Sequence, residues 1–117
     1  MQDFQSLCQL RRSYRKYTNQ IVEQEKLDYI VRCALMSPAG KRMNPWHFVV
    51  IKNEEILRQL AGCRTYGSGM FDTAMAGIVV AADTSVIDTW QCDAAIAAQN
   101  IWLAAADQEG SNPCYHP

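Results

Sequence analysis

The sequence predicts an α/β (α+β) protein in which a small sheet is sandwiched by helices. Two observations carry this prediction. Segments whose apolar residues recur at helical spacing alternate with two short runs that suit strands. The resulting order is helix, helix, strand, helix, strand, helix, which favours a sheet packed against helices. A length of 117 residues fits one domain, so we expect residues 1–117 to form a single unit.

Two helices are expected in the N-terminal third of the chain. Asp3 is a good N-cap for a first helix over residues 3–12. A second helix is expected over residues 23–36, and Pro38 ends it because the residue before a proline leaves helical geometry. The apolar stripe of this second helix consists of Leu27, Ile30, Val31, Ala34 and Leu35.

Two strands and two further helices are expected in the rest of the chain. Residues 48–51 are mostly β-branched and predict a strand, and residues 54–63 predict a short helix. The apolar run 76–82 is typical of a strand that is covered on both faces. Residues 89–108 predict a long buried helix that is apolar nearly all round. In so small a domain, its full burial would need a partner subunit, so we expect an interface helix.

Composition argues against several classes of protein. The formal net charge of -1 disfavours a nucleic-acid-coating protein, and no apolar run is long enough to span a membrane. No basic and apolar leader is visible at the N-terminus, which predicts a cytoplasmic protein. The cysteines are odd in number and form no CxxC pair, so we expect neither a metal site nor a disulfide framework. These residues are Cys8, Cys33, Cys63, Cys92 and Cys114.

A basic cluster follows the first predicted helix. Residues 11–16 contain four cations and no acid. Arginine presents a planar fork of donors that matches phosphate oxygens, and the hydroxyl of Ser13 adds a neutral donor. The cluster therefore suits phosphate recognition. Two alternatives remain open: a solvated patch beside a helix C-terminus, where cations suit the dipole, or a small interaction domain for an anionic partner.

A loop of small residues precedes the first predicted strand. Residues 37–45 include Ala39 and Gly40, which allow a flat ring to approach the backbone closely. Asn44 offers both a donor and an acceptor, a combination that suits the edge of a pyrimidine-type ring. The alternative is an ordinary connection between a helix and a strand.

In this order and spacing, the two segments resemble the nitroreductase family of FMN enzymes. The proline-containing stretch of that family is matched by residues 37–48, with Arg42 in place of the usual asparagine and Asn44 in place of glutamine. Residues 71–83 and 93–105 are similar to the family's second core strand and long interface helix. The family's Arg-Arg-Ser-x-Arg signature is matched by Arg11, Arg12, Ser13 and Arg15.

The resemblance implies a role for each matched basic residue. Arg11, Arg12 and Ser13 would hold the FMN phosphate. Arg15 would reach the pyrimidine end of the flavin, where a cation suits the negative charge of the reduced ring.

The resemblance also implies that the loop contributes to the site of a second subunit. Pro38, Ala39 and Gly40 would come from the other subunit and pack against the flavin. Asn44 would line the site, and Arg42 would replace an amide contact with positive charge.

By the same resemblance, the protein is a homodimer with shared active sites. It would transfer hydride from NAD(P)H through FMN to a nitroaromatic or quinone-type acceptor. Such chemistry needs no catalytic side chain, and neither His47 nor His116 has an evident carboxylate or thiol partner. The match stops near residue 108, where the family continues with a Gly-Leu-Gly stretch, so we expect a truncated or altered C-terminus. The alternative function is therefore a flavin-binding or inactive fragment without turnover.

Several aromatic and apolar residues are expected to serve the core. Trp46, Trp90 and Trp102 are expected in the core or in an interface. A second set of residues could border a substrate space, although a core role is favoured: Tyr66, Met70 and Phe71.

Overall fold

The computed structural model describes residues 3–109, and their elements confirm the α+β class. Helices and strands follow in the expected order, and most bounds lie within two residues of those predicted. The elements are α1 (Phe4–Leu10), α2 (Gln24–Leu35), the 3-10 turn η1 (Gly40–Arg42), β1 (Trp46–Ile51), α3 (Glu54–Ala61), the 3-10 turn η2 (Gly69–Asp72), β2 (Gly77–Ala82) and α4 (Trp90–Glu109).

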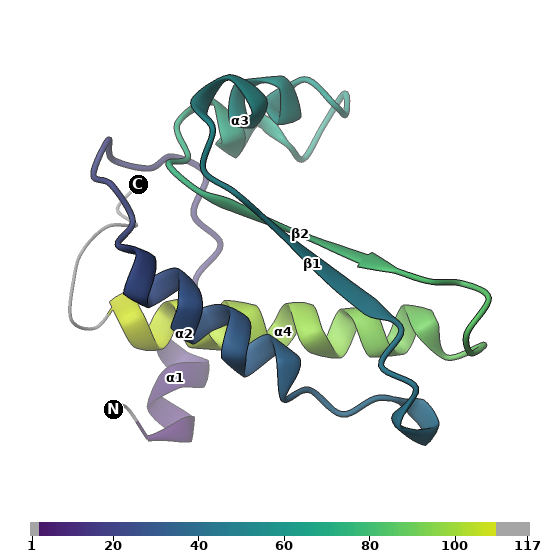
Figure 1. Cartoon of the computed structure of the whole chain (residues 1–117). Helices are drawn as coiled ribbons and strands as arrows, with labels where there is room; N and C mark the ends of the chain where they lie inside the picture. The colour runs from purple at the N-terminus through teal and green to yellow at the C-terminus, as the bar shows by residue number, and fades with distance from the viewer. Residues whose placement is uncertain (1–2, 110–117) are drawn as a thin grey trace.

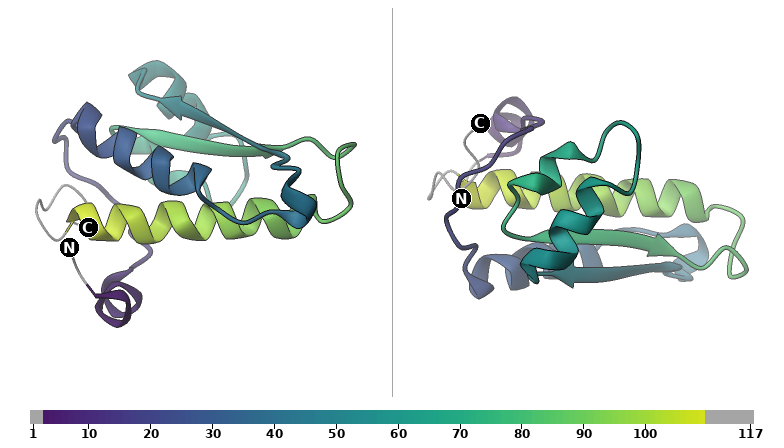
Figure 2. Two further views of the ribbon diagram at one scale, coloured as in Figure 1. Left: turned by 60° about the horizontal axis from the view of Figure 1, so that its bottom comes forward. Right: turned by 90° about the horizontal axis from the view of Figure 1, so that it is seen from above.

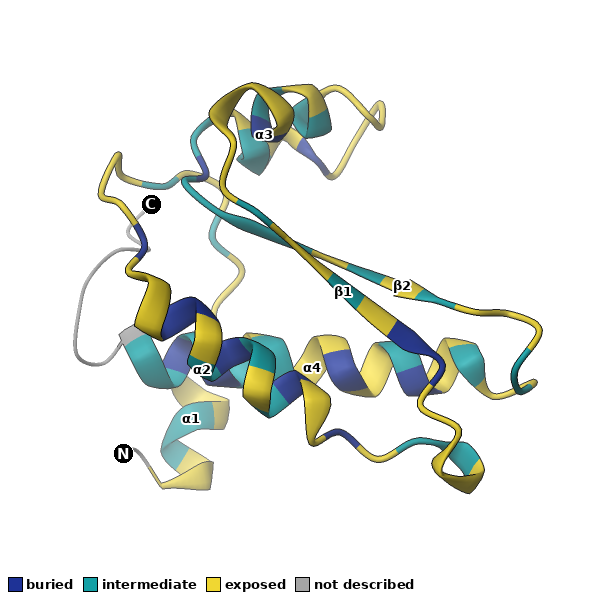
Figure 3. Cartoon of the chain, in the orientation of Figure 1, coloured by how far each residue is buried: buried dark blue, intermediate teal, exposed yellow. Residues whose placement is uncertain are grey.

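Helix α4 is the central element of the fold. It contacts α1, α2, β1 and β2, and α1 lies on the side opposite the strands (Figures 1 and 2). Its buried positions include Ala97 and Ala104, whose small side chains allow close packing of the neighbouring elements. Two large apolar residues of the same helix, Ile96 and Trp102, are 41% and 40% exposed. The chain by itself therefore buries only part of this predicted interface helix (Figure 3).

Helix α2 packs against α4 through its apolar stripe. Leu27, Ile30 and Ala34 are buried as predicted, and burying each larger side chain contributes about 2 kcal/mol. Leu35 was wrongly expected in this stripe. It is the last helical residue and is 55% exposed although Ala34 beside it is fully buried, so the buried stripe ends at Ala34. In the middle of α2, the phenol of Tyr29 donates to the Asp107 carboxylate at 2.7 Å, which raises the pKa of the phenol.

The two strands form an antiparallel pair, and burial alternates along β2 from Ile78 to Ala82. Strand β1 begins at Trp46, two residues earlier than expected, because Trp46 pairs with Ala82 in the ladder. Val49 and Val79 lie opposite each other, and both are exposed. The expectation that residues 76–82 are covered on both faces is therefore wrong within the described chain. Successive strand residues point to opposite faces, and the described helices leave Val79 and Ala81 exposed on one of them.

Helix α1 is short and lies on the surface. Asp3 caps it as predicted, since its carboxylate accepts a hydrogen bond from the Ser6 amide at 2.9 Å. The helix ends at Leu10 rather than at residue 12, because Arg11 adopts an extended conformation. None of its residues is buried, and Phe4 is 70% exposed. Its apolar side chains are thus available for contacts outside this chain.

Candidate functional site

The basic cluster after α1 is anchored to α4 by a tryptophan. The Arg11 guanidinium lies over the ring of Trp102, with its central carbon 4.5 Å from the ring centroid. The Trp102 indole N–H donates to the backbone carbonyl of Arg12 at 3.1 Å. A cation over an aromatic face contributes about 0.5–1 kcal/mol at an exposed site. These two contacts fix the backbone that leads to Ser13 and Arg15, whose side chains are exposed.

Arg12 has local partners in this structure. Its guanidinium donates to the carbonyl of Gln9, and to that of Arg11 at 3.0 Å. These carbonyls lie at the C-terminal end of α1, where cations suit the helix dipole, as the alternative interpretation of the cluster expects. A guanidinium carries five N–H donors, so two such bonds leave further donors for a phosphate oxygen.

The loop between α2 and β1 is fastened to α4 at two points. The amide of Gly40 donates to the Asp93 carboxylate at 3.1 Å. The side-chain amide of Asn100 donates to the hydroxyl of Ser37 at 2.8 Å. Asp93 and Ser37 are both buried, whereas Pro38 is exposed and Gly40 is half-buried. The loop thus presents its tip outward while its base is held.

The tip of the loop has an unusual backbone. Lys41, Arg42 and Asn44 all adopt positive φ, at 51°, 56° and 48°. A residue other than glycine in this region costs on the order of 1 kcal/mol, and such residues gather at functional sites. Of these three, sequence reasoning missed Lys41. Asparagine is enriched in this conformation, but nothing in the local sequence marks a lysine or an arginine for it.

The two predicted half-sites are held at different points of α4. The basic cluster is attached at Trp102, and the loop is attached at Asp93 through Gly40 and at Asn100 through Ser37. Trp102 and Asp93 are nine residues apart, which corresponds to about 14 Å along a helix, whereas Asn100 is two residues from Trp102. Within one chain, the residues around Gly40 and the basic cluster are therefore anchored at separate points of the same helix.

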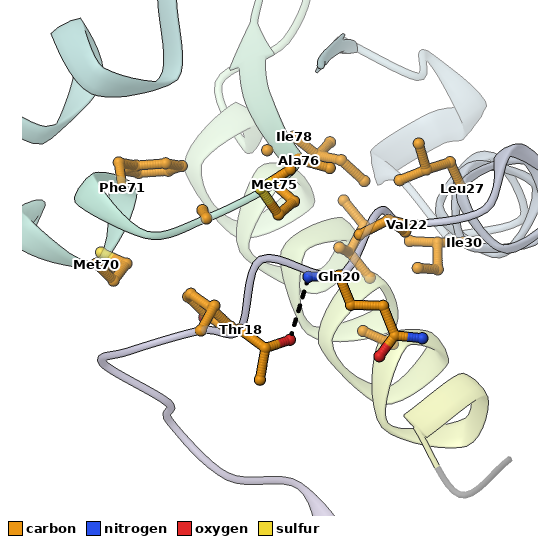
Figure 4. A pocket seen from close by; sticks show the side chains of 15 residues that line it. Thr18, Gln20, Val22, Leu27, Ile30, Met70, Phe71, Met75, Ala76 and Ile78 are labelled. Atoms are coloured by element: carbon orange, nitrogen blue, oxygen red, sulfur yellow. Dashed lines mark hydrogen bonds between the residues drawn. The ribbon is translucent and has the colours of Figure 1, made fainter. Parts of the chain in front are cut away.

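A cavity of about 270 Å³ lies apart from both groups. Residues 17–22, α2, η2, the start of β2 and α4 enclose it, and its walls are mostly apolar (Figure 4). Met70 and Phe71 line it, whereas Tyr66 is 84% exposed and does not. None of the predicted cofactor residues is among its lining residues.

Residues 3–109 contain no cluster of three or more metal-ligating side chains, and no helix among them is long and apolar enough to cross a membrane. The four described cysteines are free of disulfides. Trp46 is buried as expected, Trp90 is half-buried, and His47 is exposed. Cys114 and His116 lie outside the described residues.

Comparison with known sequences identifies a family model and longer relatives. Residues 9–63 match the model of the nitroreductase family. A protein of Archaeoglobus fulgidus, named after NADH dehydrogenase and NAD(P)H nitroreductase activities, is 33% identical over 109 residues. That match covers 90% of this chain and 62% of the relative.

Solved structures show the same arrangement of elements. An FMN-dependent nitroreductase of Clostridium difficile matches with a TM-score of 0.85 and 41% identity, over 87% of this chain and 60% of that one. A structure from Desulfovibrio desulfuricans in complex with FMN matches with a TM-score of 0.80 and 25% identity, over 93% and 65% of the two chains.

The fold is thus the α+β fold of the FMN-containing nitroreductases, with a long central helix and a loop that leads into the first strand. The chain resembles the nitroreductase family in the sequence of residues 9–63 and in its fold. It spans about three fifths of the length of the relatives that it matches.

Proposed function

We propose that this chain works in an FMN-dependent oxidoreductase that transfers hydride from NAD(P)H to a nitroaromatic or quinone-type acceptor. One observation carries the proposal: α4 holds both the basic cluster of residues 11–16, called the arginine segment from here on, and the loop whose residues adopt positive φ. Relatives whose names or titles include FMN and NAD(P)H support the choice of cofactor and reductant.

The residues of the two groups suit the chemistry of FMN. Exposed Ser13, together with the remaining donors of Arg12, offers hydrogen bonds and charge to a phosphate, and exposed Arg15 offers a cation to the pyrimidine end of the flavin. The exposed loop tip offers cations and the side chain of Asn44 to the polar edge of a flavin. When bound, FMN supplies the two-electron carrier, and the task of these residues is to bind and orient it. The proposal assigns no proton transfer to a side chain of this chain.

A second copy of the chain is the proposed partner. Because Gly40 and the arginine segment are anchored about 14 Å apart along α4, we propose that the loop of one copy completes the site at the arginine segment of the other. Exposed apolar side chains support such a contact, and one of them, Trp102, packs against Arg11 of the arginine segment. The exposed apolar side chains on α4 and in and before the loop are Leu35, Met36, Met43, Ile96 and Trp102. The proposed location is the cytoplasm.

Titration of the purified chain with FMN and with riboflavin tests the cofactor assignment. Riboflavin lacks the phosphate, so Arg12→Ala should weaken FMN binding by at least tenfold and leave riboflavin binding unchanged. Arg15→Ala should weaken both ligands, because Arg15 is assigned to the ring. The matched control is Arg64→Ala, an exposed arginine beyond α3, which should affect neither. Equal losses of FMN and riboflavin in Arg12→Ala would contradict the assignment.

Bleaching of bound flavin by NADH or NADPH then tests turnover. A reductase loses its flavin absorbance when the nicotinamide is added without oxygen and regains it when a quinone or nitroaromatic is supplied. A chain that binds FMN but shows no bleaching with either nicotinamide is the fragment without turnover that the alternative describes.

A further inference from the structure

A buried carboxylate at the start of α4 joins that helix to the loop. Asp93 is 4% exposed, and its two oxygens accept from different groups. One accepts from the backbone amide of Gly40 at 3.1 Å, and the other accepts from the hydroxyl of Thr89 at 3.0 Å. Both hydrogen bonds have ordinary lengths, so the carboxylate is satisfied although it is removed from solvent.

Helix-dipole stabilisation does not explain this burial. An acidic residue in the first turn stabilises a helix while it remains in water, and burial adds a desolvation cost that hydrogen bonds must offset. The bond from Thr89 orients the Asp93 carboxylate, and the second oxygen is thereby aimed at Gly40. Asn100, two turns further along α4, holds Ser37 in the same loop. The two polar contacts thus fasten the base of the loop to one helix.

The packing around Gly40 shows how closely the loop lies on this end of α4. A Cβ atom at Gly40 would overlap the hydroxyl of Thr89, and it would lie 3.1 Å from the Cδ1 atom of Ile87. The next two residues, Lys41 and Arg42, already have positive φ. Such conformations persist only where the surrounding structure fixes them.

We propose that Asp93 and Thr89 are positioning residues for the loop tip. They act through Gly40: by fixing its amide, they hold Lys41 and Arg42 in the left-handed conformation and set the surface that the loop presents. The link to flavin binding rests on the proposed function, in which this loop packs against the flavin of the partner copy.

Limited trypsin digestion of the flavin-free protein tests the positioning role directly. Lys41 and Arg42 are exposed cleavage sites within the held loop. Loss of two buried hydrogen bonds in Asp93→Ala should speed cleavage at these sites by about tenfold. Asp93→Asn should give a smaller increase, because an amide can still accept from Gly40 and donate to Thr89.

The control for general destabilisation is Tyr29→Phe. This variant removes the hydrogen bond between α2 and the opposite end of α4, far along the helix from the loop. It should leave cleavage after residues 41 and 42 near the wild-type rate. Unchanged cleavage in Asp93→Ala, or equal acceleration in Tyr29→Phe, would overturn the positioning role.

Flavin titration tests the link to the site. In Asp93→Ala, the affinities for FMN and riboflavin should fall by the same factor, about tenfold, because the loop is assigned to the ring rather than to the phosphate. Gly40→Ala should show the same pattern, because a Cβ atom at this position would overlap the hydroxyl of Thr89. Wild-type protein that binds no flavin overturns the proposed function and the flavin link, while the trypsin result still decides the positioning role. If the wild type and Asp93→Ala bind flavin with equal affinity, the flavin link alone is overturned.

Discussion

The backbone of the loop tip is where single residues matter most. Lys41, Arg42 and Asn44 occupy a region that residues with a Cβ atom rarely adopt, and the bonds from Asp93 and Asn100 hold the base of the same loop. Arg42 is of particular interest, because the related motif has asparagine at this position and asparagine tolerates positive φ. The arginine thus adds charge at the cost of local strain.

Two substitutions at Arg42 should change stability in opposite directions. Arg42→Asn should raise the free energy of unfolding by about 0.5 kcal/mol, since asparagine is better suited to φ of 56°. Arg42→Val should lower it by about 1–2 kcal/mol, since a β-branched side chain clashes in this region. Thermal unfolding followed by circular dichroism measures both. Equal midpoints for the two variants would show that the loop relaxes to another conformation.

Some residue roles follow from the local sequence and others do not. Asp3 is recognisable as a helix cap because its partner, Ser6, lies three residues away. The contacts of Asp93 with Gly40 and of Trp102 with Arg12 join residues 53 and 90 positions apart. No local pattern marks such pairs, so the residues that hold the candidate site become visible only once α4 is placed.

At the scale of elements, α1 is the least firmly held helix. It packs against α4 without burying any residue, and it is further held by the Asp3 cap at one end and by the contacts with Trp102 beyond the other. The hydrogen bonds from the amide and then the hydroxyl of Ser6 lower the pKa of the Asp3 carboxyl. The charged form of this carboxylate is therefore the one that stabilises the helix.

The cap makes α1 sensitive to acid. A carboxyl with a lowered pKa in the folded state stabilises that state above its ordinary pKa of 3.8, and this stabilisation is lost as the pH falls through the lowered value. Amide hydrogen exchange in α1 should therefore speed up, relative to that of α2, as the pH drops below 3.8. Asp3→Asn, which caps without titrating, should remove this pH dependence. A dependence that persists in Asp3→Asn would assign it to another group.

Local periodicity predicts where the helices and strands lie better than it predicts which of their residues are buried. The order and most bounds follow from helical and strand patterns, because these patterns depend on neighbouring residues. Burial depends on what packs on each face. The continuous apolar run 76–82 indicated two covered faces, but Val79 is 37% exposed. The apolar residues of the run show only that both faces of the strand could be buried. The described part of the chain covers only one of these faces.

At the scale of the whole molecule, α4 connects every part of the proposed site. Asp93 near its N-terminus holds the loop, and Trp102 in its C-terminal half holds the arginine segment. Ile96 lies exposed between these two residues. This arrangement suits a symmetric pair in which α4 of one copy meets the other copy. Two complete sites would then form from four half-sites.

A charge on the exposed face of α4 should separate the proposed dimer. Ile96→Glu places a carboxylate at a position that is 41% exposed in the single chain and buried in the proposed pair. Sedimentation equilibrium should give the mass of two chains for the wild type and of one chain for the variant, with loss of FMN binding. Ile56→Glu is the matched control, because Ile56 is 46% exposed on α3, and it should remain a dimer. A monomeric wild type that binds FMN would contradict the shared site.

In the proposed function, the arginine segment and the loop together make a flavin site. The decisive measurement is the visible absorption spectrum of the purified chain, recorded before and after addition of FMN and desalting. We expect flavin bands that survive desalting and differ in shape from those of free FMN. Loss of all flavin on desalting would contradict this proposal, leaving the family resemblance and the fold without a working cofactor site in this chain.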